Sequence, residues 1–311
     1  MSGEHQLDVL VVGDLFIELV MSGFPSWPRP GEETFAERFC REVGGGAAIT
    51  ACGLAKLGAR VGIFGSVGEE DGQWVLEKLT ALRIATSTIH LDDKEPTALT
   101  VSVSCPSDRA YLTYMGANRR LSELLGKAAS VGELSRARHI HLACAPDPAT
   151  VVDLFQTVSE RGCSVSADIG WHPEWLSDPR CQKALRTVDI FFPNEREASH
   201  MTGGNDPERM LEALRDEGFR KVALKLGPEG AALLWDGKIM FQKAIPVESV
   251  DTTGAGDCFD AGFLDAWLRA DAPQNCLRAG TICGALSTRA LGGVSGFPTR
   301  ADLQSELEST T

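Results

Sequence analysis

The sequence lacks the long apolar runs that mark membrane proteins and the leader that marks exported ones. A membrane-spanning helix needs roughly 20 consecutive apolar residues, and no apolar run in these 311 residues comes near that length. Residues 1–8 are polar and lack the charged-then-apolar layout of a signal peptide. We therefore expect a cytoplasmic protein with no membrane partner.

Basic residues are also scarce. The 30 Lys and Arg stand against 43 Asp and Glu, which gives a formal charge of −13 at pH 7. A chain this acidic should not bind nucleic acid through a general basic surface. It can still hold a small anion in a local pocket, because net charge says little about a single site.

Paired cysteines are absent as well. The nine cysteines are odd in number, form no C-x-x-C pair, and mostly lie among apolar or small residues. This usage predicts buried free thiols in a reducing compartment rather than a disulfide scaffold. Among the six histidines, His139 and His141 flank one residue of a predicted strand and share a face, so they form either a metal site or, as we favour, a structural pair.

Glycine, by contrast, is abundant at 32 residues, and apolar runs alternate with helical patterns along the chain. The predicted strands of the main sheet are 7–13, 61–65, 139–144, 164–169, 189–192 and 222–226. The predicted helices are 47–57, 71–82 with Asp71 as its cap, 150–160, 207–217, 255–269 and 273–291. This alternation predicts one α/β domain over 1–311, with a doubly wound, mostly parallel sheet and helices on both faces.

Two segments, approximately 16–43 and 96–116, interrupt the alternation and look β-rich. Within the second, 97–104 and 109–115 alternate apolar and polar residues around a turn at 106–108. These segments predict a small β-sheet lid that either covers a site or joins two subunits. The chain end, 304–311, is polar and predicted to be frayed.

The strongest motif is Asp251 to Asp257, DTTGAGD, between a segment of strand character at 243–250 and a predicted helix. A Gly-rich turn that opens a helix offers free N–H groups and the positive end of the helix dipole to an anion. Gly254, Ala255 and Gly256 would supply those groups. Asp257 is then either a general base beside a transferring phosphoryl group or an acidic residue favoured by the dipole alone.

The segment DTTGAGDCFDAGF resembles the C-terminal signature of the ribokinase-like (PfkB) carbohydrate kinase family. Four further segments are similar to family elements and occur in the family's order. They are 43–58 (VGGGAAITACGLAKLG), 116–118 (GAN), 192–197 (FPNERE) and 225–230 (KLGPEG). Because the ordered matches extend over nearly the whole chain, the resemblance implies the family's fold, including the lid.

The resemblance also implies roles for individual residues. Asp257 would take a proton from the substrate hydroxyl that attacks the γ-phosphate of ATP, and the turn 254–256 would be the anion hole. Asn194 and Glu197 would organise Mg²⁺, an ion that prefers oxygen ligands and keeps several waters. Alternatively, Asn194 caps a helix at 195–201 with Glu197 in its capping turn. The two readings are compatible.

The nucleotide side is assigned by the same resemblance. Lys225, Gly227 and Gly230 follow a predicted strand, where ligands bind in open α/β sheets. The alternative is an ordinary hairpin turn into a strand at 231–235. Thr253 lies beside the nucleotide, and Asp251 with Ser295 matches the place where many family members hold a monovalent cation such as K⁺.

The substrate side is predicted around the first strand. Asp14 and Glu18 would accept hydrogen bonds from sugar hydroxyls. Gly44 and Gly45 would lie under the substrate, and Asn118 would contact it. Ile49 departs from the family pattern, which has Asn at that position. A substrate hydroxyl facing Ile49 would go unpaired, at roughly 1–3 kcal/mol, so the substrate or its pose should differ from that of ribokinase.

The sequence thus predicts an ATP- and Mg²⁺-dependent kinase of a sugar or sugar-like alcohol, with a homodimer through the lid. A nucleoside kinase of the same family is one alternative, because Ile49 and aromatic residues such as Phe16, Phe39 and Tyr114 near the lid suit a base. A non-catalytic sugar or nucleotide sensor that kept the fold is another. Ile49 favours the sensor, and the intact GAGD turn opposes it.

Overall fold

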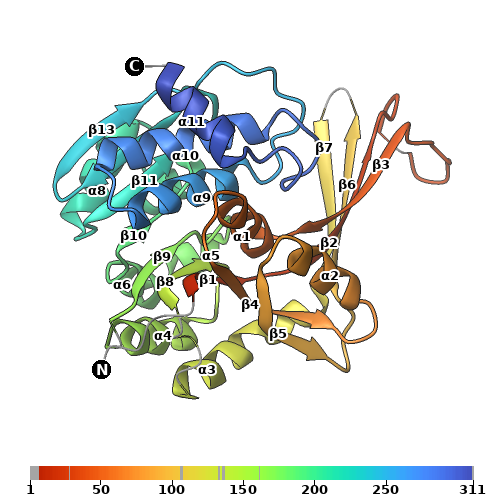
Figure 1. Ribbon diagram of the computed structural model, residues 1–311, viewed down its shortest axis with the longest axis horizontal. Coiled ribbons are helices and arrows are strands. Elements are labelled where there is room, and N and C mark those ends of the chain that lie inside the picture. Colours follow the sequence, from red (N-terminus) through yellow and green to blue (C-terminus); the bar gives the residue numbers. More distant parts are fainter. Residues whose placement is uncertain are drawn as a thin grey trace.

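The main body of the molecule is a nine-stranded sheet (Figure 1). The computed structural model describes residues 7–27, 29–105, 108–131, 134, 137–160 and 162–309. In spatial order the strands are β13 (Lys238–Gln242), β12 (Ala231–Trp235), β11 (Lys221–Lys225), β10 (Ile190–Phe191), β9 (Ser164–Ala167), β8 (Ala137–Ala143), β1 (Leu7–Gly13), β4 (Val61–Gly68) and β5 (Ala85–Asp92). From β11 to β5 all neighbours are parallel, and β12 and β13 add an antiparallel edge. The predicted mostly parallel sheet is confirmed.

Helices cover both faces of this sheet. The elements of one face are α1 (Gly46–Lys56), α2 (Gln73–Ala81), α9 (Ala255–Leu268), α10 (Pro273–Ser287) and α11 (Arg300–Ser309). Those of the other are α3 (Leu121–Val131), α4 (Pro148–Glu160), α5 (Pro173–Ser177), α6 (Pro179–Leu185), α7 (Glu195–Thr202) and α8 (Pro207–Asp216). Val9 and Val11 of β1 belong to the first core, and Leu10 and Val12 to the second. Alternate residues of one strand therefore serve two cores, which is why its run is apolar throughout.

A separate four-stranded sheet, which we call the small sheet, lies to one side (Figure 1). Its order is β3 (Arg38–Gly44), β2 (Phe16–Ser22), β6 (Ala98–Cys105) and β7 (Asp108–Tyr114). It is built from the two segments predicted as the lid. Only two residues separate β1 from β2, so the small sheet is rooted at the carboxyl end of β1. Of the predicted turn at 106–108, residues 106 and 107 lie outside the described residues, and Asp108 begins β7.

Several local predictions were wrong. Asp71 does not cap α2, which begins after Gly72; its carboxylate accepts from the backbone N and hydroxyl of Thr97 instead, at 2.9 and 2.5 Å. Residues 243–250 form no strand. Helix α10 ends at Ser287 rather than at residue 291. The predicted frayed end is instead helix α11 through Ser309, because buried Leu303 anchors it to the core.

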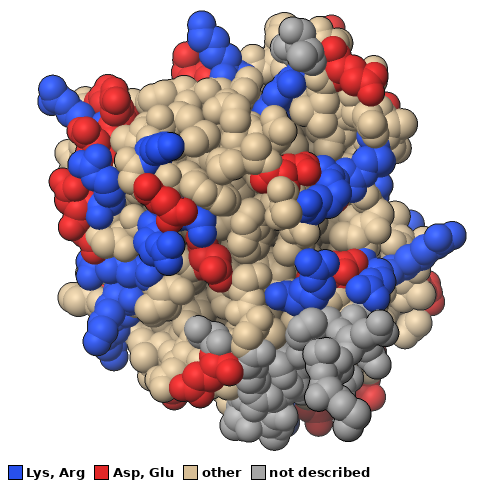
Figure 2. Space-filling model, turned by 60° about the vertical axis from the view of Figure 1, so that its left-hand side comes forward, with Lys and Arg blue, Asp and Glu red and all other residues tan. Residues whose placement is uncertain are grey.

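No helix among the described residues combines the length and apolar character needed to cross a membrane. On the face drawn in Figure 2, basic side chains are interspersed with acidic ones around uncharged surface.

Candidate active site

The predicted site residues gather at the carboxyl edge of the main sheet. Asp14 directly follows β1, Asp168 follows β9, and Lys225 ends β11. Because these strands are parallel, their carboxyl ends meet at the same edge, where ligands bind in open α/β sheets. The start of α9 lies among them, since a Cβ at Gly256 would be 3.4 Å from Lys225 Nζ.

The GAGD turn forms the start of α9. Gly254 is the N-cap, with φ of 70°, and no side chain caps the helix among the described residues. A Cβ at Gly254 would lie 2.8 Å from Ile49 Cδ1 and 3.0 Å from Gly293 Cα, so only glycine fits. The first turn therefore presents backbone N–H groups, as an anion site requires. The N–H of Ala255 is an exception in this structure, because it donates to Thr252 O at 3.2 Å.

Ile49 lies beneath this turn. Its side chain is buried and packs against Gly254 and Gly293. The sequence interpretation had treated Ile49 only as a missing hydrogen-bond partner for substrate. The structure adds that its apolar branch packs against the backbone of the predicted anion hole.

Asp257 lies in the first turn of α9, close to the glycine-rich start of α1. A Cβ at Gly46 would lie 2.9 Å from Asp257 Oδ1. Burial and the negative charge of Asp168 raise the pKa of Asp257 to about 7, while Lys225 opposes the shift. A carboxylate with a pKa near neutrality is well matched to general base chemistry at physiological pH.

Two acidic residues that the sequence analysis missed surround Lys225. Its Nζ lies 2.6 Å from Asp168 Oδ2 and 3.2 Å from Asp260 Oδ1. Oxygens of Asp168, Asp257 and Asp260 lie within 4.8 Å of one another. Burial alone would lower the pKa of Lys225, but the two carboxylates hold it above its usual value. Asp260 follows Asp257 by three residues on one helix face, which was the available signal.

Asn194 and Glu197 form a capping box at the start of α7. The Asn194 carboxamide oxygen accepts from Glu197 N at 2.9 Å, and Glu197 Oε2 accepts from Asn194 N at 2.9 Å. Asn194 Nδ2 also donates to Glu197 Oε1 at 2.6 Å. Burial and nearby Asp168 raise the pKa of Glu197 to about 7. The capping alternative is confirmed, and the Mg²⁺ role stays a prediction.

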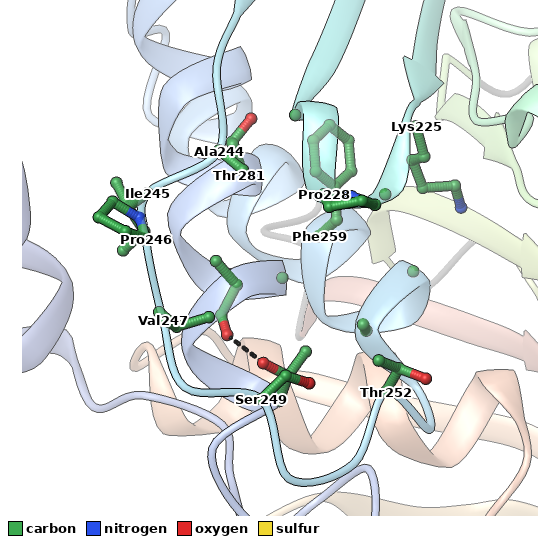
Figure 3. A pocket seen from close by; sticks show the side chains of 17 residues that line it. Lys225, Pro228, Ala244, Ile245, Pro246, Val247, Ser249, Thr252, Phe259 and Thr281 are labelled. Atoms are coloured by element: carbon green, nitrogen blue, oxygen red, sulfur yellow. Dashed lines mark hydrogen bonds between the residues drawn. The ribbon is translucent and has the colours of Figure 1, made fainter. Parts of the chain in front are cut away.

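A cavity of about 480 Å³ opens beside Lys225 (Figure 3). Residues 244–247 lie on one side of it and Lys225 with Pro228 on the other, while Ser249 and Thr252 stand at its rim. Gly256 and Phe259 of α9 also line it, as does α10. The segment 243–250, wrongly predicted as a strand, is thus a wall of this cavity. Its volume and its mostly apolar walls suit a small organic ligand.

The turn from Lys225 to Gly230 is both a hairpin and a pocket wall. It joins β11 to antiparallel β12 through a short 3-10 helix, Gly227–Glu229. Gly230 has φ of 105°, and a Cβ there would lie 2.0 Å from Gln242 O, so the turn requires glycine. The hairpin alternative is confirmed, and Lys225, Gly227 and Gly230 all line the cavity.

The predicted substrate residues meet between β1 and the small sheet. Burial raises the pKa of Asp14 to about 7. A Cβ at Gly44 would lie 2.8 Å from Glu18 Oε2, and one at Gly45 would lie 2.3 Å from Asp14 O. Asn118 accepts from Leu15 N at 3.2 Å and donates to Leu15 O at 3.1 Å. Asn118 therefore fixes the backbone next to Asp14.

The predicted monovalent-cation residues are held by other contacts. Asp251 Oδ1 accepts from Thr253 N and Oγ1 at 2.9 and 2.8 Å, and its Oδ2 accepts from Gly292 N at 2.9 Å. The Ser295 hydroxyl donates to Glu42 on β3. Asp251 thus ties the GAGD segment to the loop around Gly292, and the same loop contacts the small sheet.

The histidine pair is structural. His139 Nδ1 lies 2.9 Å from Ser164 Oγ and its Nε2 2.7 Å from Ser166 Oγ, while His141 Nδ1 lies 2.8 Å from Ser166 Oγ. Burial lowers the pKa of both imidazoles, so both are neutral at physiological pH. This favours the structural reading made from the sequence.

Comparison with known proteins identifies the family of this chain. Residues 6–300 match the model of the pfkB family carbohydrate kinases. The chain belongs to this family. It is 28% identical over 306 residues to a ribokinase of Haemophilus influenzae, covering 96% of this chain and 97% of that one. The predicted family, fold and enzyme class are confirmed.

A further relative and a solved structure carry the names of different kinases. A nucleoside kinase of Methanothermobacter thermautotrophicus is 29% identical over 274 residues, covering 87% of this chain and 86% of that one. The crystal structure of a putative ribokinase II from E. coli in complex with ATP and Mg²⁺ has a TM-score of 0.82 at 22% identity, covering 97% of this chain and 99% of that one.

Proposed function

We propose that this pfkB-family kinase transfers the γ-phosphoryl group of ATP to a hydroxyl of a sugar or sugar-like alcohol. The observation that carries the proposal is the convergence of Asp257, the turn 254–256 and the cavity beside Lys225 at one edge of the sheet. The cavity takes the nucleotide, and the acceptor lies near Asp14 and Glu18, on the other side of Asp257.

In the proposed reaction, Asp257 accepts the proton of the acceptor hydroxyl as its oxygen attacks the γ-phosphorus. The backbone N–H groups of residues 254–256 stabilise the charge on the phosphoryl oxygens, and the bond to the ADP oxygen breaks. Such catalysis depends mainly on positioning and electrostatics. Asn194 and Glu197 fit a Mg²⁺ ion, since their carboxamide and carboxylate oxygens are ligands it accepts, with bound water between. When bound, that ion would neutralise phosphate charge.

The residues around the proposed acceptor site favour a polyol as the substrate. Asp14 and Glu18 supply carboxylates for vicinal hydroxyls, whereas Ile49 is turned against Gly254. A nucleoside remains the second candidate, because a named nucleoside kinase is similar over most of the chain and because aromatic Tyr114 and Phe39 lie on the small sheet.

Further features belong to the same proposal. The small sheet acts as a lid and as the contact between two subunits, and K⁺ binds at the loop shared by Asp251 and Ser295. Most of the nine cysteines are buried, which agrees with a location in the reducing cytoplasm.

The test is an ATP-consumption screen against sugars, sugar phosphates and nucleosides, with Asp257→Asn as the matched control. We expect one polyol class to give turnover with Mg²⁺, and the variant to lose nearly all turnover while binding ATP about as well. A variant that keeps more than a few per cent of the activity would remove Asp257 from its assigned role. Turnover with nucleosides alone would select the second candidate.

A further inference from the structure

Lys225 is held by a buried ionic array that the proposed chemistry leaves unexplained. Its side chain is 11% exposed, while Asp260 is fully buried. Asp168 comes from the end of β9 and Asp260 from α9, so the two carboxylates grip Nζ from different elements. Burying such charges is expensive, and well-packed apolar residues are often at least as stable. An array of this kind therefore calls for a reason beyond stability.

The position of Nζ indicates that reason. Lys225 lines the cavity assigned to the nucleotide, and Nζ lies against Gly256 of the anion-hole turn. An ammonium group has three donors. Asp168 Oδ2 lies 2.6 Å from Nζ, and Asp260 Oδ1 and Oδ2 lie 3.2 and 3.4 Å from it. Because the 3.4 Å contact is longer than an ordinary N–H···O hydrogen bond, one donor can turn to an oxygen of a phosphate that enters the cavity.

Asp260 has a second polar neighbour on its buried side. His141 Nε2 lies 4.0 Å from Asp260 Oδ2, and this inaccessible nitrogen has no hydrogen-bond partner among the described residues. His141 is itself fixed through Nδ1 by Ser166 of β9. The imidazole therefore lies close to Asp260 Oδ2, the oxygen that is also 3.4 Å from Lys225 Nζ.

The geometry points to Asp260, backed by His141, as a positioning residue that holds the Lys225 ammonium between the nucleotide cavity and the anion-hole turn. A lysine side chain has four flexible carbon–carbon bonds and would otherwise sample many positions. Because Asp168 and Asp260 hold the Lys225 ammonium in place, it offers a fixed positive charge to the phosphate group that lies closest to the site of phosphoryl transfer. The inference rests on the proposed function, because it takes the occupant of the cavity to be a nucleoside triphosphate.

The test is a double-mutant cycle of Asp260→Asn and Lys225→Met, read as the Kd for ATP from calorimetry without acceptor and as steady-state constants. Lys225→Met should weaken ATP binding about 10- to 100-fold, since it removes a charge-assisted hydrogen bond. Asp260→Asn, which is isosteric, should raise the KM for ATP roughly three- to tenfold and leave the KM for the acceptor unchanged. When Asp260→Asn is added to Lys225→Met, it should change the Kd and the KM for ATP by less than about twofold.

A matched control exists on the same helix. Asp265 is also buried and ion-paired, but its partners are Arg269 and Arg300, which do not line the cavity. Asp265→Asn should lower thermal stability and spare the KM for ATP. An equal effect of the two substitutions on that KM would overturn the inference, as would an Asp260→Asn effect that is the same in both backgrounds.

The design also separates this inference from the proposed function. If Asp260→Asn fails to fold, the comparison of Lys225→Met with the double variant, which removes both buried charges, still decides the matter: a difference above twofold in ATP affinity overturns the inference. A wild-type protein that binds ATP but phosphorylates nothing contradicts the proposed function, and the calorimetric cycle still tests the array. A wild-type protein that does not bind ATP overturns both.

Discussion

At the scale of single residues, burial does most to shape the chemistry of the site. Asp14, Asp257 and Glu197 are ordinary carboxylic acids in sequence, yet burial raises the pKa of each to about 7. Lys225 shows the opposite balance, because two carboxylates outweigh the cost of burying its charge. Near the predicted site of phosphoryl transfer, the buried carboxyl groups can therefore ionise around neutral pH, while Lys225 keeps its positive charge.

The raised pKa of Asp257 predicts a pH dependence. A base accepts a proton only when ionised, so kcat/KM should be constant above about pH 7 and fall about tenfold per pH unit below it. The groups that face Asp257 are Asp168, Glu18 and Lys225. The measurement is kcat/KM from pH 5 to 9 at saturating Mg²⁺, with ADP binding followed over the same range as the control. A kcat/KM that stays constant from pH 7 down to pH 5 would contradict the assignment.

Gly254 gives a prediction about the anion hole. Alanine at this position combines a positive φ with contacts under 3 Å to Ile49, so the turn must shift. We expect Gly254→Ala to lower activity at least about 100-fold, the cost of losing one well-placed donor. Gly58→Ala is the matched control, because Gly58 has φ of 91° but nothing within 4 Å of its Cβ position. Its activity should be retained. Similar losses in both variants would point to strain rather than to the anion hole.

At the scale of elements, strand-and-helix alternation was enough to predict most of the main sheet. The apolar run of β1 was predicted at its observed bounds, because both faces of that strand are buried. The predictions missed β5, β13 and α11, whose patterns are more polar or half-exposed. They also missed the helices α3, α5 and α6. Residues 243–250 look like a strand in sequence, but the segment forms none and runs along the cavity instead.

Helix α7 shows how one pair can serve both structure and chemistry. Glu197→Gln keeps the capping box, since Gln also fills that position, but it loses one of the two hydrogen bonds that Glu197 accepts from Asn194 and should cost about 1 kcal/mol of stability. It removes the carboxylate, so the Mg²⁺ concentration for half-maximal activity should rise severalfold. Asp206→Ala is the control, because it removes the N-cap of α8 alone. That variant should lose about 1 kcal/mol of stability and keep its Mg²⁺ dependence. An unchanged Mg²⁺ requirement in Glu197→Gln would exclude Glu197 from metal binding.

At the scale of the whole molecule, the small sheet carries an unusual amount of exposed apolar surface. Phe39 is 64% exposed and Leu112 is 66% exposed, on strands at opposite edges of that sheet. Exposed apolar patches on a soluble protein commonly mark interaction sites. The loop around Gly292 connects the same sheet, through Glu42 and Ser295, to the Asp251 segment before the GAGD turn.

This surface predicts a dimer. In sedimentation at micromolar concentration we expect twice the chain mass of 33.4 kDa, and Leu112→Glu should shift the protein to the monomer. Val152→Glu is the control, because Val152 is an exposed apolar residue of α4. A wild-type monomer at every concentration would show that the small sheet does not join two subunits.

The amino-acid sequence alone determined the fold class and the chemical character of the GAGD turn, because apolar periodicity and glycine spacing are local properties of the chain. It did not determine which distant side chains meet. Asp168, Lys225 and Asp260 are widely separated in sequence, and only the parallel strands and α9 bring them together. Likewise, Ile49 looked like a lost polar contact until the fold placed it under Gly254. Contacts between elements depend on strand order and helix packing, which no local pattern contains.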